Sequence, residues 1–140
     1  MKRTIFTSML LLMTMCVFGA DDETVIRKFY TNCVFGNEYY ENGNVSVLRR
    51  YCSPGIIKRL RAEYEYDGTG YAVYIFRTAT QDSNPDVSPD EIESGIKSIT
   101  PLGKGWYRVS YTDGGWPGCT DVRVKKGLIS DMRKDKSWKN

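Results

Sequence analysis

The chain has 140 residues, including ten tyrosines and no histidine, and its formal net charge is +3. This length predicts one domain, and so small a charge gives no reason to expect a nucleic-acid partner. Without histidine, the chain cannot assemble a Ser-His-Asp or Cys-His catalytic group, and it lacks the commonest transition-metal ligand. Its cysteines include no close-spaced pair of the zinc-binding kind, so we expect no cofactor.

The first twenty residues are typical of a secretory signal peptide. Lys2 and Arg3 precede an apolar run over residues 5–18, which ends in two small residues followed by acidic ones. Two alternatives stay open. One is an uncleaved membrane anchor, and the other is a lipoprotein acylated at Cys16, which is weaker because Met15 rather than a small residue precedes that cysteine. We expect an exported protein, periplasmic or extracellular, with residues 1–20 removed and no transmembrane segment left.

The exported part is predicted to be one α+β domain over residues 21–133, followed by a frayed basic tail over residues 134–140. Cleavage would remove two cations and no carboxylate, so the mature protein would be close to neutral. Its charge is uneven, because residues 78–95 carry five carboxylates and no cation. A solvated acidic loop is the simplest interpretation of that segment.

Three helices are predicted in the first half of this domain. The first follows the N-cap candidates Asp21 and Asp22 and ends near Gly36-Asn37. A polar turn over residues 38–44 leads to a short helix over 45–51, and Ser53-Pro54 then starts a third helix. The apolar stripe of the first helix consists of Val25, Ile26, Phe29, Tyr30, Cys33 and Val34. The later helices share a basic outer side formed by Arg49, Arg50, Lys58, Arg59 and Arg61.

The second half predicts an antiparallel meander of four strands over residues 96–132. Apolar and polar residues alternate there, and turns with glycine at 103–105, 113–115 and 126–127 separate the strands. Before the meander, residues 71–78 predict a strand or an extended rim segment, and residues 80–93 predict a polar loop. The alternation places on one face Tyr107, Val109, Tyr111, Thr120, Val122 and Val124.

That apolar face is predicted to pack on the first helix, at Ile26, Phe29 or Tyr30, because the chain offers no second apolar layer. Arg108 and Arg123 then fall on the outer face, where truncation to alanine is expected to cost little stability.

The alternation also predicts where the carboxylates of the sheet lie. Asp121 falls on the polar face, while Asp113 and Asp131 fall at turns or strand ends. No carboxylate is therefore predicted to point inward beside a tyrosine, which argues against a pocket enzyme.

Three segments mark this order of helices and strands: Val25-Ile26-Arg27-Lys28-Phe29-Tyr30, Tyr51-Cys52-Ser53-Pro54-Gly55 and Gly105-Trp106-Tyr107-Arg108-Val109. With them the chain resembles the nuclear-transport-factor-2-like, or cystatin-like, fold, and in particular small exported bacterial families of uncharacterised function with that fold. The resemblance implies a sheet curled around a helix into a cone, often with a pocket. Members include enzymes, binding modules and protein-interaction domains, so the resemblance does not assign a function.

The exported part contains three cysteines, Cys33, Cys52 and Cys119, which allow one disulfide and leave one thiol over. Three pairings are open from the sequence. Cys33 is expected to take part, because its helical stripe faces the core.

An acidic segment matches the spacing of an EF-hand-like calcium loop at positions 1, 3, 5, 7, 9 and 12. The side chains at these positions are Asp82, Asn84, Asp86, Ser88, Asp90 and Glu93. Val87 stands where such loops need glycine, and Pro85 and Pro89 stiffen the segment, so an acidic solvated loop is the favoured interpretation.

Aromatic side chains are the remaining signal, because there are more of them than one core requires. Trp116, Tyr71, Tyr74 and Trp106 are the candidate ligand-binding residues, since amphipathic rings suit a pocket mouth. Trp116 lies between glycine and proline at a turn, without an obvious strand partner.

The sequence thus predicts an exported non-catalytic domain that binds a small ligand, glycan or protein through its concave sheet or rim. One alternative is a small pocket enzyme that uses a carboxylate–tyrosine pair. Another is a structural module that forms a homodimer through its sheet.

Removal of the signal peptide predicts a specific mass for the mature protein. Protein recovered from an exporting host should lack residues 1–20 and begin at Asp21, because signal peptidases cleave after small residues. Intact-mass spectrometry measures this directly. An intact chain that begins at Met1 would contradict the prediction, and a lipid adduct on Cys16 would favour the lipoprotein alternative.

Overall fold

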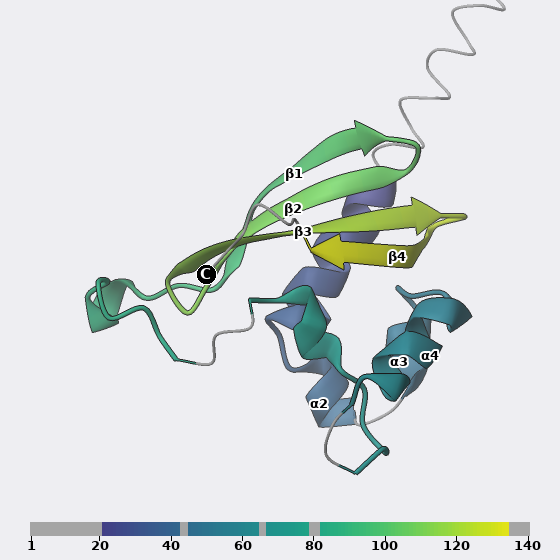
Figure 1. Cartoon of the computed structure of the whole chain (residues 1–140), viewed down its shortest axis with the longest axis horizontal. Coiled ribbons are helices and arrows are strands. Elements are labelled where there is room, and N and C mark those ends of the chain that lie inside the picture. Colours follow the sequence, from purple (N-terminus) through teal and green to yellow (C-terminus); the bar gives the residue numbers. More distant parts are fainter. Residues whose placement is uncertain (1–20, 43–44, 65–66, 79–81, 135–140) are drawn as a thin grey trace, which may run out of the picture.

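A computed structural model describes residues 21–42, 45–64, 67–78 and 82–134. Within these ranges the protein has an α+β architecture, as predicted, with its helices placed before a four-stranded antiparallel sheet. The N-terminal helix, purple in Figure 1, crosses one face of the sheet, and α3 and α4 lie near β4. Residues 1–20 and 135–140, which include the predicted signal peptide and most of the predicted tail, lie outside the described ranges.

The N-terminal helix comprises α-helical residues 21–29 and a π-helical turn, η1, over Tyr30–Val34. Its predicted stripe is buried at Ile26, Phe29, Tyr30, Cys33 and Val34. The π turn is marked by a hydrogen bond from the Phe35 N–H to the Tyr30 carbonyl oxygen, at 2.8 Å, and it was not predicted. The helix ends at the predicted place. A Cβ atom at Gly36 would lie 2.4 Å from the Thr31 carbonyl oxygen, so only glycine fits there.

Three short helices follow: α2 over Glu38–Asn42, α3 over Val45–Arg49 and α4 over Pro54–Ala62. The predictions of α3 and α4 are confirmed, and the Ser53 hydroxyl accepts a hydrogen bond from the Ile56 N–H at 3.4 Å, as an N-cap should. The prediction of a polar turn over 38–44 is wrong for residues 38–42, which are helical. Tyr39 is buried in this helix, and its tertiary contacts outweigh the polar composition of the segment.

The prediction of a strand or extended segment over 71–78 is also wrong, because Val73–Phe76 forms a 3-10 helix, η2. Val73 and Phe76, three residues apart, are both buried, which is the spacing of that helix. The Phe76 carbonyl oxygen accepts hydrogen bonds from the hydroxyls of Tyr30, at 3.1 Å, and Thr120, at 3.2 Å. These hydrogen bonds satisfy a buried backbone carbonyl that, in a strand, would be paired with a neighbouring strand. A second 3-10 turn, η3, covers Pro89–Glu91 in the acidic loop.

The predicted meander is confirmed. Its strands are β1 (Gly95–Gly103), β2 (Trp106–Asp113), β3 (Trp116–Lys125) and β4 (Leu128–Lys134), and they are hydrogen-bonded in that order. Each connection is a two-residue turn in which both residues have positive φ, the geometry that suits the twist of a hairpin. Lys134 belongs to β4, so the predicted tail begins one residue too early.

The inner face of the sheet packs on the N-terminal helix, as the alternation predicts. The buried inner-face residues are Tyr107, Val109, Tyr111, Thr120, Val122 and Val124. The rings of Tyr30 and Tyr111 lie 6.0 Å apart, and the rings of Phe29 and Phe76 lie 4.9 Å apart in an edge-to-face arrangement.

The outer face carries a row of charged side chains. The alternation predicts the face on which they lie, but it does not predict that the carboxylate among them is buried. Arg108, Asp121 and Arg133 are direct neighbours on β2, β3 and β4. The Asp121 side chain is only 3% exposed, and its oxygens accept hydrogen bonds from Arg108 Nε at 2.9 Å and Arg133 Nε at 3.2 Å. Arg108 is therefore a partner of a buried carboxylate, and its loss should cost more than the sequence predicts.

The packing predicts that Phe29→Ala lowers the free energy of unfolding by about 3–5 kcal/mol, because the cavity would lie between helix, η2 and sheet. Arg123→Ala is the matched control. It removes a large outer-face side chain and should cost well under about 1 kcal/mol. Urea unfolding followed by circular dichroism measures both, and equal losses would contradict the assignment of inner and outer faces.

Candidate functional site

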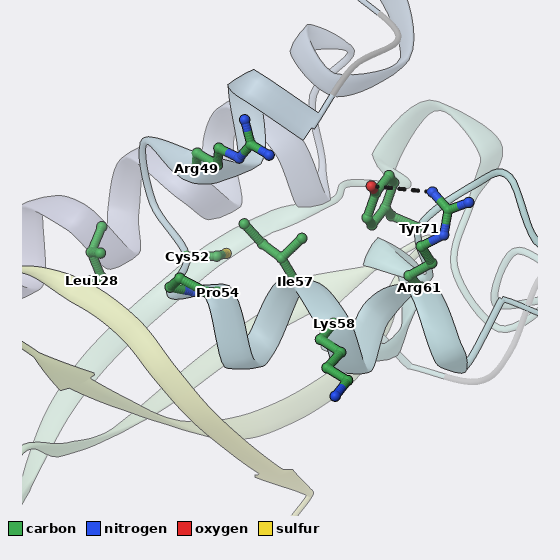
Figure 2. A pocket seen from close by; sticks show the side chains of 8 residues that line it. All are labelled: Arg49, Cys52, Pro54, Ile57, Lys58, Arg61, Tyr71 and Leu128. Atoms are coloured by element: carbon green, nitrogen blue, oxygen red, sulfur yellow. Dashed lines mark hydrogen bonds between the residues drawn. The ribbon is translucent and has the colours of Figure 1, made fainter.

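A pocket of about 430 Å³ opens between α3, α4 and the turn before β4 (Figure 2). It is lined by Arg49, Cys52, Pro54, Ile57, Lys58, Arg61, Tyr71 and Leu128. Ile57 lies at the centre of the view, with Arg49 on one side of it and α4 on the other. The lining combines three cations with an apolar floor and one tyrosine ring, and it contains no carboxylate.

The helical repeat of α4 places its pocket residues on one side. Pro54, Ile57, Lys58 and Arg61 recur at intervals of three and four residues, whereas Ile56 and Leu60 turn to the core. The other wall is fixed by the backbone, because the Ile129 N–H donates to the Tyr51 carbonyl oxygen at 2.8 Å. The Ser53 N–H donates in turn to the Ile129 carbonyl oxygen at 2.9 Å. The pocket is thus built where the N-cap of α4 meets the start of β4.

The three cations of the pocket differ from several other arginines of the described ranges in having no ion pair there. Within the described ranges, no carboxylate lies within ion-pair distance of Arg49, Lys58 or Arg61. By contrast, carboxylate partners are found for Arg50, Arg59, Arg77, Arg108 and Arg133.

Tyr71 connects the pocket to the aromatic residues of α2. Its hydroxyl accepts a hydrogen bond from Arg61 Nη1 at 3.4 Å, and its N–H donates to the Tyr39 hydroxyl at 3.0 Å. The guanidinium carbon of Arg61 also lies 5.7 Å from the centre of the Tyr71 ring. These contacts hold both side chains at the edge of the pocket before any ligand arrives. Of the four predicted ligand-binding aromatics, the structure places Tyr71 in this pocket.

The other three predicted aromatics have structural contacts away from the pocket lining. Trp116 Nε1 donates to the Asp82 carbonyl oxygen at 2.9 Å, which fastens the acidic loop to the β2–β3 turn. The Trp106 ring lies 4.1 Å from the guanidinium carbon of Arg133 on the outer face. The Tyr74 hydroxyl donates to the carbonyl oxygen of Glu63, the residue that caps α4. Sequence composition gave no means to separate these roles from ligand binding.

The segment that matches the spacing of a calcium loop does not bring three of its acidic side chains together. Among the described residues, no three acidic or cysteine side chains form a group that could hold a metal ion. Asn84 already uses both ends of its amide, since Oδ1 accepts from the Asp86 N–H at 3.0 Å and Nδ2 donates to the Gly115 carbonyl oxygen at 3.2 Å. The segment instead docks on the β2–β3 turn, where the Asn84 N–H donates to the Gly114 carbonyl oxygen.

The carboxylates of the sheet have partners that stabilise structure. Asp113 lies at the end of β2, in agreement with its predicted place at a turn or strand end. It is buried on the inner side, however, so the prediction that no carboxylate points inward is wrong. Arg77 binds both of its oxygens, and the Thr78 hydroxyl donates to one of them at 2.7 Å. Burial alone would raise the pKa of Asp113, but these hydrogen bonds outweigh burial and the net pKa is lowered. A general base needs the opposite shift.

Two carboxylate–tyrosine pairs do exist among the described residues. The Tyr51 hydroxyl donates to Glu38 at 3.4 Å, and the Tyr107 hydroxyl donates to Asp22 at 2.9 Å. Burial, followed by this hydrogen bond, raises the pKa of Tyr107 to about 12, so the phenol stays protonated. None of these four residues lines the pocket described above. The Asp22–Tyr107 pair fastens the start of the N-terminal helix to β2.

The described residues include no helix with the length and apolar character needed to cross a membrane. Comparisons with protein-family models, with curated proteins and with solved structures find no match to this chain.

The lowered pKa of Asp113 makes a prediction about pH. A carboxylate whose pKa is lower in the folded state stabilises the protein above its unfolded pKa of about 3.9, and this contribution is lost as the pH falls through the folded pKa. Asp113→Asn should therefore cost about 1–3 kcal/mol at pH 7 and markedly less near pH 2. Urea unfolding at both pH values tests this. Asp90→Asn, in the exposed acidic loop, is the control, and a cost of Asp113→Asn that does not change with pH would contradict the assignment.

Proposed function

We propose that this protein is an exported, non-catalytic binding domain, and that its pocket at the helical rim takes a small anionic ligand with an apolar or aromatic part. The proposal keeps the cone-like fold that the sequence resembles, but it places the ligand at the rim rather than on the concave sheet. The inner-face side chains at Val109 and Val122 are fully buried under the N-terminal helix, so that part of the sheet offers no space to a ligand.

The observation that carries the proposal is the absence of carboxylate partners for Arg49, Lys58 and Arg61, within the described ranges, around a pocket with an apolar floor. Cations held near one another repel, and an anion between them would replace this repulsion with attraction. In Figure 2 Arg49 and Arg61 flank Ile57, while Lys58 extends along the far side of α4. Arg49 and Arg61 are therefore the first choice for holding the charged group.

The apolar lining of the pocket favours a ligand that has an apolar part as well as a negative charge. Ile57, Pro54 and Leu128 provide apolar surface, and Tyr71 provides a ring whose hydroxyl is already bonded to Arg61. A volume of about 430 Å³ lies in the range of small-molecule pockets. An inorganic anion would leave the apolar floor exposed to water, so a larger organic anion fits better.

The two alternative functions have less support from the described residues. A pocket enzyme would need its carboxylate–tyrosine pair in the pocket, and neither the Asp22–Tyr107 pair nor the Glu38–Tyr51 pair lines it. A dimer through the sheet would need an apolar outer face, whereas that face carries the Arg108–Asp121–Arg133 row. The exposed large apolar side chains of the described residues, Tyr40, Tyr74 and Leu102, lie on three different elements, and only Leu102 belongs to the sheet.

The proposal is tested with a pair of fluorescent probes that share a naphthylamine body. 1-Anilinonaphthalene-8-sulfonate carries the anionic group, and N-phenyl-1-naphthylamine lacks it. The sulfonate should bind at least about tenfold more tightly than the neutral probe, and raised salt should weaken it. The double variant Arg49→Ala/Arg61→Ala should reduce sulfonate affinity about tenfold and leave the neutral probe nearly unchanged.

The matched control is Lys97→Ala/Lys104→Ala, which removes the same number of charges from β1 and the turn after it, at the edge of the sheet opposite β4. The control variant should bind both probes as the original protein does. Equal affinity for the two probes, or equal losses in the two double variants, would contradict a specific anion site in this pocket.

A further inference from the structure

Two of the three cysteines in the described residues lie in the same part of the core. Cys33, in η1, is fully buried, and Cys52, which follows α3, is 1% exposed and lines the pocket. We propose that Cys33 and Cys52 form the internal disulfide of this protein when it folds in an oxidising compartment, and that Cys119 is the thiol left over. In the present structure all three are thiols.

Contacts on both sides of the pair bring their segments together. The residue before Cys33 bonds to the residue before Cys52, since Asn32 Nδ2 donates to the Tyr51 hydroxyl at 3.2 Å. Glu38 reaches the same segment, accepting from Arg50 Nη1 at 2.8 Å. The N-terminal helix and the chain before α4 therefore run side by side at the positions of the two thiols.

Cys119 lies on the other side of the sheet from this pair. It is the β3 partner of Ser110, so both occupy the outer face, together with Arg108 and Asp121. Its neighbour Thr120 points inward, where its hydroxyl reaches the Phe76 carbonyl oxygen at 3.2 Å. A bridge from Cys119 to either core cysteine would have to pass through the sheet, and the three pairings open from the sequence reduce to one.

The burial of the pair determines when the bridge can form. Burial, followed by the charge of Glu38, raises the pKa of Cys33 to about 12, and burial raises the pKa of Cys52 further. Since the thiolate is the attacking species, the folded reduced protein should oxidise slowly. The bridge is therefore expected to form during folding, before the core closes.

The chemistry is two thiol–disulfide exchanges with an external disulfide as oxidant. One thiolate attacks that disulfide and forms a mixed disulfide, and the first thiol of the oxidant leaves. The second cysteine thiolate then attacks the mixed disulfide, and the second thiol leaves. The two cysteines lose two electrons and two protons in total, and the oxidant gains them as two thiols.

The test is refolding of the reduced protein in oxidised and reduced glutathione, followed by peptide mapping without reduction. Trypsin cuts after lysine and arginine and places Cys33, Cys52 and Cys119 on residues 29–49, 51–58 and 109–123, and Cys16, where the first twenty residues are retained, on residues 4–27. The expected product joins 29–49 to 51–58. A bridge to 109–123 in the monomer, or three thiols after oxidative refolding, would overturn the proposal.

A stability measurement adds a second readout. The bridge closes a loop of about 20 residues, so reduction should lower the Tm by on the order of 10 °C. Cys119→Ser should keep this sensitivity to reduction, and Cys33→Ser should lose it. The same loss in both variants would overturn the assignment, and if Cys33→Ser does not fold, the peptide map of the original sequence decides.

This proposal does not depend on the ligand proposal. The refolding experiment supplies its own oxidant, so its result also does not depend on export. A bridge found in the refolded protein but absent from protein made in an exporting host would count against export, not against the pairing.

Discussion

The packing of the N-terminal helix on the inner face of the sheet is the contact on which the rest of the structure depends. Tyr30 stands at its centre, with ring contacts to Phe29, Phe76 and Tyr111 and a hydrogen bond to the Phe76 carbonyl oxygen. Burial, as the largest cause, raises the pKa of this phenol well above its ordinary value, so it remains a hydrogen-bond donor. One side chain thus connects the helix, the 3-10 turn and the sheet.

This contact also determines where a ligand can bind. The N-terminal helix buries the inner face of the sheet and leaves no space for a ligand there. The pocket lies instead between α3, α4 and the start of β4. The same helix supports the pocket from behind, because Asn32 and Phe29 contact Tyr51, next to the pocket residue Cys52. Away from the pocket, arginines form ion pairs with the buried carboxylates Asp113 and Asp121 and connect neighbouring segments of the sheet region.

Much of the fold could be predicted because local signals agree with the global arrangement. The alternation from Trp106 to Lys125 predicts both faces of β2 and β3, and glycine predicts the hairpin turns. The Ser53-Pro54 pair predicts the start of α4 through capping. What could not be predicted depends on contacts far apart in the sequence. The segment of Val73 and Phe76 has β-forming residues, yet hydrogen bonds from Tyr30 and Thr120 hold it as a 3-10 turn.

The candidate site was predictable only in part, for the same reason. The basic outer side of α3 and α4 is visible in the sequence, and Tyr71 was among the expected ligand residues. Which arginines have carboxylate partners is not visible, because Glu38 and Asp131 reach Arg50 and Arg59 from other elements. The burial of Asp113 likewise depends on Arg77, which is remote in sequence.

The central claim is that the rim pocket, and not the concave sheet, is the binding site. It is tested most directly by titrating the ¹⁵N-labelled protein with 1-anilinonaphthalene-8-sulfonate and following the backbone amide signals by NMR. The account predicts shifts at Cys52, Ile57 and Leu128, which line the pocket, and none at Val109 or Val122 under the helix. Shifts centred on Val109 and Val122 would place the ligand on the inner face of the sheet and contradict the account.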